Sequence, residues 1–172
     1  PIGAISGTKI CKTKICLLLL HMANKYLKIN LHLVFAAKCH QSFALDENLD
    51  KIHAYIAKII NERGSHAIKV GGTSSHVHIL LDFAANMPLG DLVRDLKSLS
   101  AGFINKNFLS PYYFRWQTGY ACFSVSTYDT ERVISYIEHQ KEHHEKQSLH
   151  DEMKSMLERA QITYDEKYIL DE

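Results

Sequence analysis

The sequence predicts an α+β fold of the ferredoxin-like type, in which an antiparallel sheet carries helices on one face. Short runs of β-branched and apolar residues alternate with longer segments whose apolar residues recur at helical spacing. The order of these elements is βαββαβ, and one more helical segment follows the last strand. With 172 residues, 46% of them hydrophobic, the chain has enough apolar material for one core.

Each element follows from a local pattern. In chain order we expect a strand at about 26–37, a helix at about 46–63, strands at about 66–71 and 76–82, a helix at about 89–107 and a strand at about 119–126. The first helix carries an isoleucine-rich stripe and ends at Gly64, and Pro88 opens the second helix. A Gly-rich turn joins the two middle strands into a hairpin. The charged segment 142–159 is expected to be a solvated helix that continues or follows the preceding one.

Composition limits the class of protein. The formal net charge is +1, so any nucleic-acid surface must be a local patch rather than a property of the whole molecule. The four cysteines lack zinc-like Cys-x-x-Cys spacing and are typical of reduced thiols in a cytoplasmic protein. No apolar run in the sequence approaches the length of a membrane span, so we expect no membrane partner.

The first 21 residues match none of these patterns. Three lysines precede the apolar run 15–20, which imitates a signal peptide but is too short and lacks a small-residue cleavage site. We therefore expect residues 1–21 to be an extension and residues 22–172 to form a single domain that begins at Met22. A genuine N-terminal arm is the alternative.

Two histidines separated by one apolar residue form the first candidate site. His76 and His78 lie on the second strand of the predicted hairpin, where alternate side chains point to the same side. Val77 and Ile79 then point into the core and the two imidazoles point away from it. Two imidazoles at this spacing on a rigid strand can bind one divalent metal ion. A histidine pair on a solvated strand face is the alternative.

The second candidate is Tyr136, in a predicted helix that Asp129 or Thr130 caps. At 100° per residue, Gln140 lies one turn beyond Tyr136 on the same helical face. A phenol and an amide oxygen therefore share one surface beside the apolar stripe. The alternative is an ordinary amphipathic helix with an interfacial tyrosine.

Together, these segments resemble one family. His76-Val77-His78 resembles the His-hydrophobic-His (HUH) motif, and residues 136–140 resemble the Tyr-Ile-x-x-Gln helix of the single-tyrosine HUH transposases. These IS200-like enzymes move insertion sequences as single-stranded DNA. The opening strand at 31–38, the Trp-Gln-containing stretch 115–126 and the segment 162–168 are similar to further parts of the family.

The resemblance implies a chemistry and a role for each motif residue. Tyr136 would be the nucleophile that attacks the scissile phosphodiester, giving a 5′-phosphotyrosine and a free 3′-OH. His76 and His78 would bind a divalent metal ion, Mg²⁺ or Mn²⁺, with Gln140 as the third ligand by its match to the family's motif. The substrates would be single-stranded DNA hairpins at the ends of an insertion sequence.

The sequence defines DNA contacts and assembly less closely. The candidate DNA-binding residues are four cations and one aromatic residue: Lys38, Arg94, Lys97, Arg115 and Trp116. A solvated charge or a core aromatic is the alternative for each. The resemblance also implies a homodimer that pairs the histidines of one subunit with the tyrosine of the other, with a hinge at residues 124–127.

Three other functions remain open from the sequence. A domesticated relative that processes chromosomal hairpins would use the same chemistry. A metal-dependent hydrolase would use the histidines without Tyr136, and a non-catalytic ferredoxin-like nucleic-acid binder would use neither motif. A covalent protein–DNA adduct distinguishes a transposase from the last two.

Overall fold

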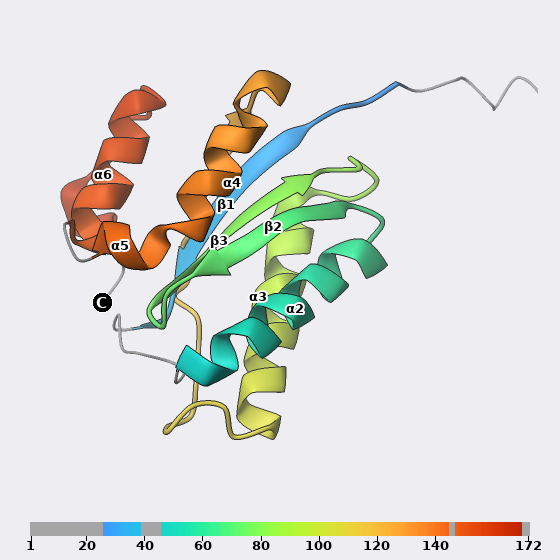
Figure 1. Ribbon diagram of the computed structural model, residues 1–172, viewed down its shortest axis with the longest axis vertical. Helices are drawn as coiled ribbons and strands as arrows, with labels where there is room; N and C mark the ends of the chain where they lie inside the picture. Colours follow the sequence, from blue (N-terminus) through green and yellow to red (C-terminus); the bar gives the residue numbers. More distant parts are fainter. Residues whose placement is uncertain (1–25, 39–45, 145–146, 170–172) are drawn as a thin grey trace, which may run out of the picture.

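Four antiparallel strands form one sheet in the order β2-β3-β1-β4 (Figure 1). The computed structural model describes residues 26–38, 46–144 and 147–169. The strands are β1 (Asn30–Ala36), β2 (His66–Gly72), β3 (His76–Asp82) and β4 (Ala121–Val125), and the crossover helices are α2 (Asp46–Glu62) and α3 (Leu89–Lys106). This order is the ferredoxin-like arrangement, which confirms the predicted fold class. The predicted extension at residues 1–21 and its boundary at Met22 lie outside the described residues.

Side-chain alternation on the two central strands separates the faces of the sheet. Leu33 and Phe35 of β1 point toward α2 and α3, as do Val77, Ile79 and Leu81 of β3. The apolar stripes of the two helices complete this main core with Leu49, Ile52, Ile56, Ile59 and Ile60 of α2 and Leu92, Val93, Leu96 and Ile104 of α3. Both crossover helices therefore cover the same face, and burial of this apolar surface drives the sandwich to form.

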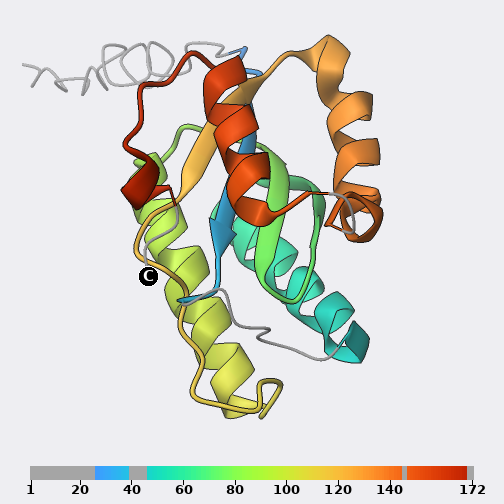
Figure 2. The same ribbon diagram turned by 90° about the vertical axis from the view of Figure 1, so that its left-hand side faces the viewer.

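A second layer of helices covers the opposite face of the sheet (Figures 1 and 2). It consists of α4 (Thr130–Glu138), α5 (Gln140–His144) and α6 (Leu149–Arg159). Val34 and Ala36 of β1 pack against Leu149 and Met153 of α6. The helix predicted within 142–159 is present as α6, but the prediction that it is solvated is wrong for one face, because Leu149, Glu152 and Met153 are buried.

Two element boundaries also differ from the prediction. Strand β1 begins at Asn30 rather than near residue 26. The tyrosine-bearing helix is interrupted at His139, whose backbone has φ −98° and ψ 21°, so that α4 ends at Glu138 and α5 begins at Gln140.

Gly71 of β2 permits a close approach of α4, since a Cβ there would lie 2.6 Å from Cγ2 of Ile137. In the part of the chain that the structure describes, no helix has the length and apolarity to cross a membrane.

Candidate active site

The histidine pair lies on β3, on the face opposite the main core. Both His76 and His78 have 0% exposed surface, because the layer of α4 to α6 covers this face. They point away from the main core, as the alternation predicts, but they are not on a solvated strand face. The antiparallel pairing of β1 with β3 sets Ala36 opposite His76 and Val34 opposite His78.

Neighbouring side chains orient both imidazoles. Nδ1 of His76 lies 3.0 Å from Oγ1 of Thr73 and 3.1 Å from Oγ of Ser75, both in the turn before β3. Nδ1 of His78 lies 3.0 Å from Nε2 of His32 on β1. Both Nδ1 atoms are therefore engaged by protein partners, and the Nε2 atoms face the interior of the site. Contacts of this kind hold the tautomer and ring orientation of metal-binding histidines.

A carboxylate from α6 joins the motif residues at one point. Tyr136 donates its hydroxyl hydrogen bond to Oε1 of Glu152, and Nε2 of Gln140 donates to the same oxygen at 3.0 Å. Because Gln140 donates through its amide nitrogen, its Oε1 faces Nε2 of His76 at 3.1 Å. Nε2 of His78 lies 3.4 Å from Oε1 of Glu152. The structure thus brings the predicted residues Tyr136, His76, His78 and Gln140 together within one chain.

The donor set fits a divalent cation. One ligand atom each from His76, His78 and Glu152 lies within 4.8 Å of the others. Among the described residues, Nε2 of His78 is buried without a hydrogen-bond partner although a carboxylate oxygen lies close to it. A metal ion can bridge Nε2 of His78 and the carboxylate of Glu152 at this separation, as can a proton on Nε2. Two imidazoles and a carboxylate are donors that bind divalent metal ions in proteins.

Burial sets the protonation of the site. Desolvation lowers the pKa of His76 to about 3 and of His32 to about 4, and it lowers the pKa of His78 well below its usual range. All three imidazoles are therefore neutral at pH 7, the form that binds a metal. Burial, and then the hydrogen bond to Glu152, raise the pKa of Tyr136 above its usual value. The phenol consequently keeps its proton and needs a base in order to act as a nucleophile.

Sequence reasoning missed Glu152 and His32. The local sequence around neither residue indicates a functional site. Glu152 interrupts the apolar stripe Leu149-x-x-x-Met153 of α6. His32 stands between Leu31 and Leu33 on β1, as a polar residue commonly does in a strand. A carboxylate on an otherwise apolar helical stripe was the available signal for Glu152. Its burial to 6% exposure is what identifies it as part of the site.

The predicted DNA-binding residues lie at a different place, around α3 and the segment before β4. Arg94, Lys97, Arg115 and Trp116 line one hollow there, and the backbone nitrogen of Lys38 donates to the carbonyl oxygen of Arg115 at 2.9 Å. All five candidates therefore lie close together in the fold, although they come from three separate segments.

Two of these five residues have structural roles. The indole of Trp116 is 7% exposed, packs edge-on against Phe35 and Phe114, and donates to Oγ of Ser100 at 2.9 Å. This enclosure favours the alternative of a core aromatic for Trp116, and its contact with DNA stays a prediction. Nζ of Lys97 donates to three consecutive backbone carbonyls, those of residues 117–119. Lys97 therefore holds the segment before β4 against α3.

Comparison with known proteins identifies the family. A sequence profile described as "Transposase IS200 like" matches residues 25–140, more than half of the chain. The chain therefore belongs to the IS200-like transposase family. A search of curated proteins gave no significant match.

Two solved structures share the fold. One is a protein from Deinococcus radiodurans R1 assigned as a transposase, with 24% identity, a TM-score of 0.55, and coverage of 68% of this chain and 94% of that one. The other is a REP-associated tyrosine transposase bound to a REP hairpin, with 14% identity, a TM-score of 0.54, and coverage of 70% and 72%. At these sequence identities, the structural similarity shows that the three proteins share a fold.

Proposed function

We propose that this transposase cleaves and rejoins single-stranded DNA at hairpins through a covalent bond between Tyr136 and a 5′ phosphate. The observation that carries the proposal is the meeting of Tyr136, Gln140 and the two β3 histidines around Glu152. Family membership supports DNA transposition, and a structural neighbour bound to a hairpin supports this class of substrate.

The reaction is an in-line displacement at phosphorus. Oη of Tyr136 attacks the phosphodiester, a bond forms between this oxygen and phosphorus, and the bond from phosphorus to the 3′ oxygen breaks. Glu152 accepts the phenol proton, since it already receives the hydrogen bond of that hydroxyl. The departing 3′ oxygen takes a proton from water and leaves as a 3′-OH. Attack of a new 3′-OH on the phosphotyrosine reverses these steps, so rejoining needs no nucleotide cofactor.

Four residues are candidates to hold Mg²⁺ or Mn²⁺ beside the nucleophile. His76 and His78 supply the nitrogen donors, Gln140 is the third ligand expected from the motif, and Glu152 offers an anionic oxygen at the same point. When bound, the cation supplies positive charge that polarises the scissile phosphate. Because the site is buried, charge interactions with the phosphate are stronger there than in water. For the same reason, the DNA strand can reach the two histidines only if the helices α4 to α6 move apart from the sheet.

The decisive experiment looks for the covalent intermediate. Hairpins that flank the gene are incubated as single strands with the protein and Mn²⁺, and a denaturing gel separates protein–DNA adducts. We expect an adduct with the unaltered protein and none with Tyr136→Phe, which keeps the ring but lacks the attacking oxygen. Tyr128→Phe is the matched control, because Tyr128 is 98% exposed and lies just before α4.

An adduct that persists in Tyr136→Phe would show that Tyr136 is not the nucleophile. DNA cleavage without any adduct would instead favour a metal-dependent hydrolase, and DNA binding without cleavage would favour a non-catalytic binder. The domesticated relative shares the chemistry, so inverted hairpin repeats on both sides of the gene are what would identify a mobile element.

A further inference from the structure

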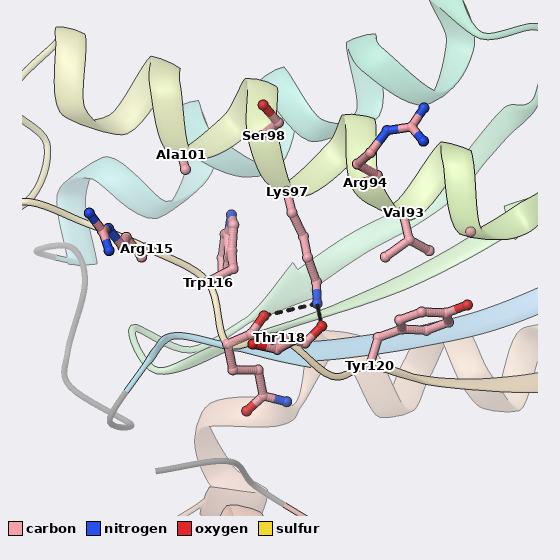
Figure 3. A pocket seen from close by; sticks show the side chains of 11 residues that line it. Val93, Arg94, Lys97, Ser98, Ala101, Arg115, Trp116, Thr118 and Tyr120 are labelled. Atoms are coloured by element: carbon pink, nitrogen blue, oxygen red, sulfur yellow. Dashed lines mark hydrogen bonds between the residues drawn. The ribbon is translucent and has the colours of Figure 1, made fainter.

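A hollow of about 470 Å³ lies between α3 and the segment that leads into β4 (Figure 3). We propose that it binds one unpaired base of the DNA strand, an inference that rests on the function proposed above. The volume falls within the range of small-ligand sites. The hollow lies beside the edge strand β4 and the crossover helix α3, whereas Tyr136 belongs to α4, in the helical layer on the opposite face of the sheet. The base bound here is therefore remote from the scissile phosphate.

The walls of the hollow suit a flat aromatic ligand. Val93 and Ala101 of α3 and the rings of Trp116 and Tyr120 supply its apolar surface. Tyr120 is 42% exposed, so its ring remains accessible for stacking even though Lys97 lies 5.6 Å from its centroid. Every nucleobase has a π face, so stacking on such a ring needs no particular sequence. Trp116 contributes as an enclosed wall rather than as a free stacking platform.

Charge around the hollow favours a phosphate-bearing ligand. The residues that line it include three cations, Arg94, Lys97 and Arg115, and no carboxylate. Arg94 is engaged by Asp91 and Asp95, and Lys97 by backbone carbonyls. Arg115, by contrast, pairs with no carboxylate within the described ranges and is exposed at one end of the hollow. Arg115 is therefore the cation best situated to bind the phosphate of the inserted nucleotide.

The surface next to the hollow can carry neighbouring nucleotides. Along the segment before β4, Phe114 and Trp116 point inward, whereas Tyr113 and Arg115 are exposed. The guanidinium carbon of Arg115 lies 5.4 Å from the ring centroid of Tyr113, and Tyr113 is 74% exposed. Lys38 is also exposed and bonds to Arg115 through its backbone. The exposed ring of Tyr113 beside Arg115, together with Lys38, extends the surface that a single strand can follow from the hollow.

The test separates base insertion from attraction to phosphates. Affinity is measured for an oligothymidylate and for an abasic oligomer of the same length and charge. Two variants alter the hollow: Ser98→Trp fills it from an exposed position on α3, and Tyr120→Ala removes the exposed ring. Leu99→Trp is the matched control, since Leu99 is the next residue on α3, is 40% exposed and does not line the hollow. Tyr120→Phe keeps the ring.

We expect the unaltered protein to bind the oligothymidylate at least about tenfold more tightly than the abasic oligomer, because stacking of one base on an aromatic ring contributes about this much affinity. Ser98→Trp and Tyr120→Ala should reduce this preference while binding the abasic oligomer normally, and Leu99→Trp and Tyr120→Phe should leave it unchanged. Arg115→Gln should weaken binding of both oligomers alike, because it acts on phosphate.

Equal affinity of the unaltered protein for both oligomers would overturn the inference. An undiminished preference in both Ser98→Trp and Tyr120→Ala would do the same. These affinities do not depend on Tyr136 chemistry, so a missing covalent adduct would refute the proposed function without changing them. Conversely, adduct formation with no base preference would refute only the base-binding hollow.

Discussion

The hydroxyl of Tyr136 on α4 donates a hydrogen bond to the carboxylate of Glu152 on α6. The same carboxylate oxygen accepts from Gln140 and lies 3.4 Å from Nε2 of His78. A helix that the local pattern assigns to solvent therefore supplies the charged group at the centre of the site. The proposed chemistry therefore depends on the position of α6 on the sheet, which Leu149 and Met153 maintain.

Glu152→Gln should slow cleavage by about a hundredfold or more, because the amide keeps the shape of the side chain but cannot take the phenol proton. DNA binding should change little. The measurement is the initial rate of adduct formation at saturating hairpin and Mn²⁺. Glu158→Gln, at an exposed position later on the same helix, is the matched control and should cleave at the normal rate. A normal rate for Glu152→Gln would remove the proposed base.

His76→Ala and His78→Ala should each abolish cleavage, and a chelator should do the same to the unaltered protein. Mn²⁺ should also raise the melting temperature of the unaltered protein, since a ligand that binds only the folded state stabilises it. This rise should disappear in both variants and persist in His66→Ala, which alters an exposed histidine at the start of β2. Gln140→Ala should retain partial activity because water can replace an amide ligand. Full cleavage in excess chelator would contradict a metal-dependent reaction.

The protein should lose stability steeply in mild acid. Burial lowers the pKa of four histidines, to about 4 for His32 and His53, to about 3 for His76, and in the same direction for His78. Their pKa returns to about 6.5 on unfolding, so the unfolded chain binds more protons below that pH. The free energy of unfolding should therefore be highest above pH 6.5 and fall as pH drops toward 4, by up to about 1.4 kcal/mol per pH unit for each histidine.

Urea unfolding at a series of pH values measures this slope. His53→Gln should reduce the slope by about one proton, because this residue then no longer titrates. A free energy of unfolding that stays constant between pH 7 and pH 5 would contradict the buried, neutral state of these histidines.

Gly71→Ala should impair catalysis through the position of α4. The new Cβ would lie 2.6 Å from Cγ2 of Ile137 and 3.1 Å from its carbonyl oxygen, so the helix must move away from β2. Because Tyr136 is the preceding residue, its hydroxyl shifts relative to the histidines, and a displacement of about 1 Å can cost about a hundredfold in rate. Gly102→Ala is the control, since a Cβ there meets no atom within 4 Å and Gly102 does not line the hollow beside α3. Equal cleavage rates in the two variants would show that α4 tolerates the displacement.

We retain the prediction of a homodimer, which sedimentation can test, and expect its active sites to be complete within each chain. The ring of Tyr136 lies 5.8 Å from that of His78 in the same chain, so no partner is needed to bring them together. A mixture of His76→Ala and Tyr136→Phe subunits should therefore stay inactive. Recovery of cleavage in the mixture would support the exchange of tyrosine helices between subunits that the resemblance implies.

Local patterns in the sequence determined the strands, the crossover helices and most of the candidate site. Strand periodicity put His76 and His78 on one side of β3, because alternate side chains always share a face. Helical periodicity put Gln140 one turn beyond Tyr136, and both meet Glu152 despite the interruption at His139. These relationships depend on residues a few positions apart, so they can be read without the fold.

The tertiary structure alone decided what lies opposite these residues. Glu152 reaches the site because α6 packs on the face of the sheet that α2 and α3 leave open, and a helix with many charged residues does not reveal which of them it buries. Trp116 belongs to the core rather than to the surface because Phe35 and Phe114 enclose its ring. Contacts between distant segments depend on how whole faces pack together, and local periodicity carries no information about that packing.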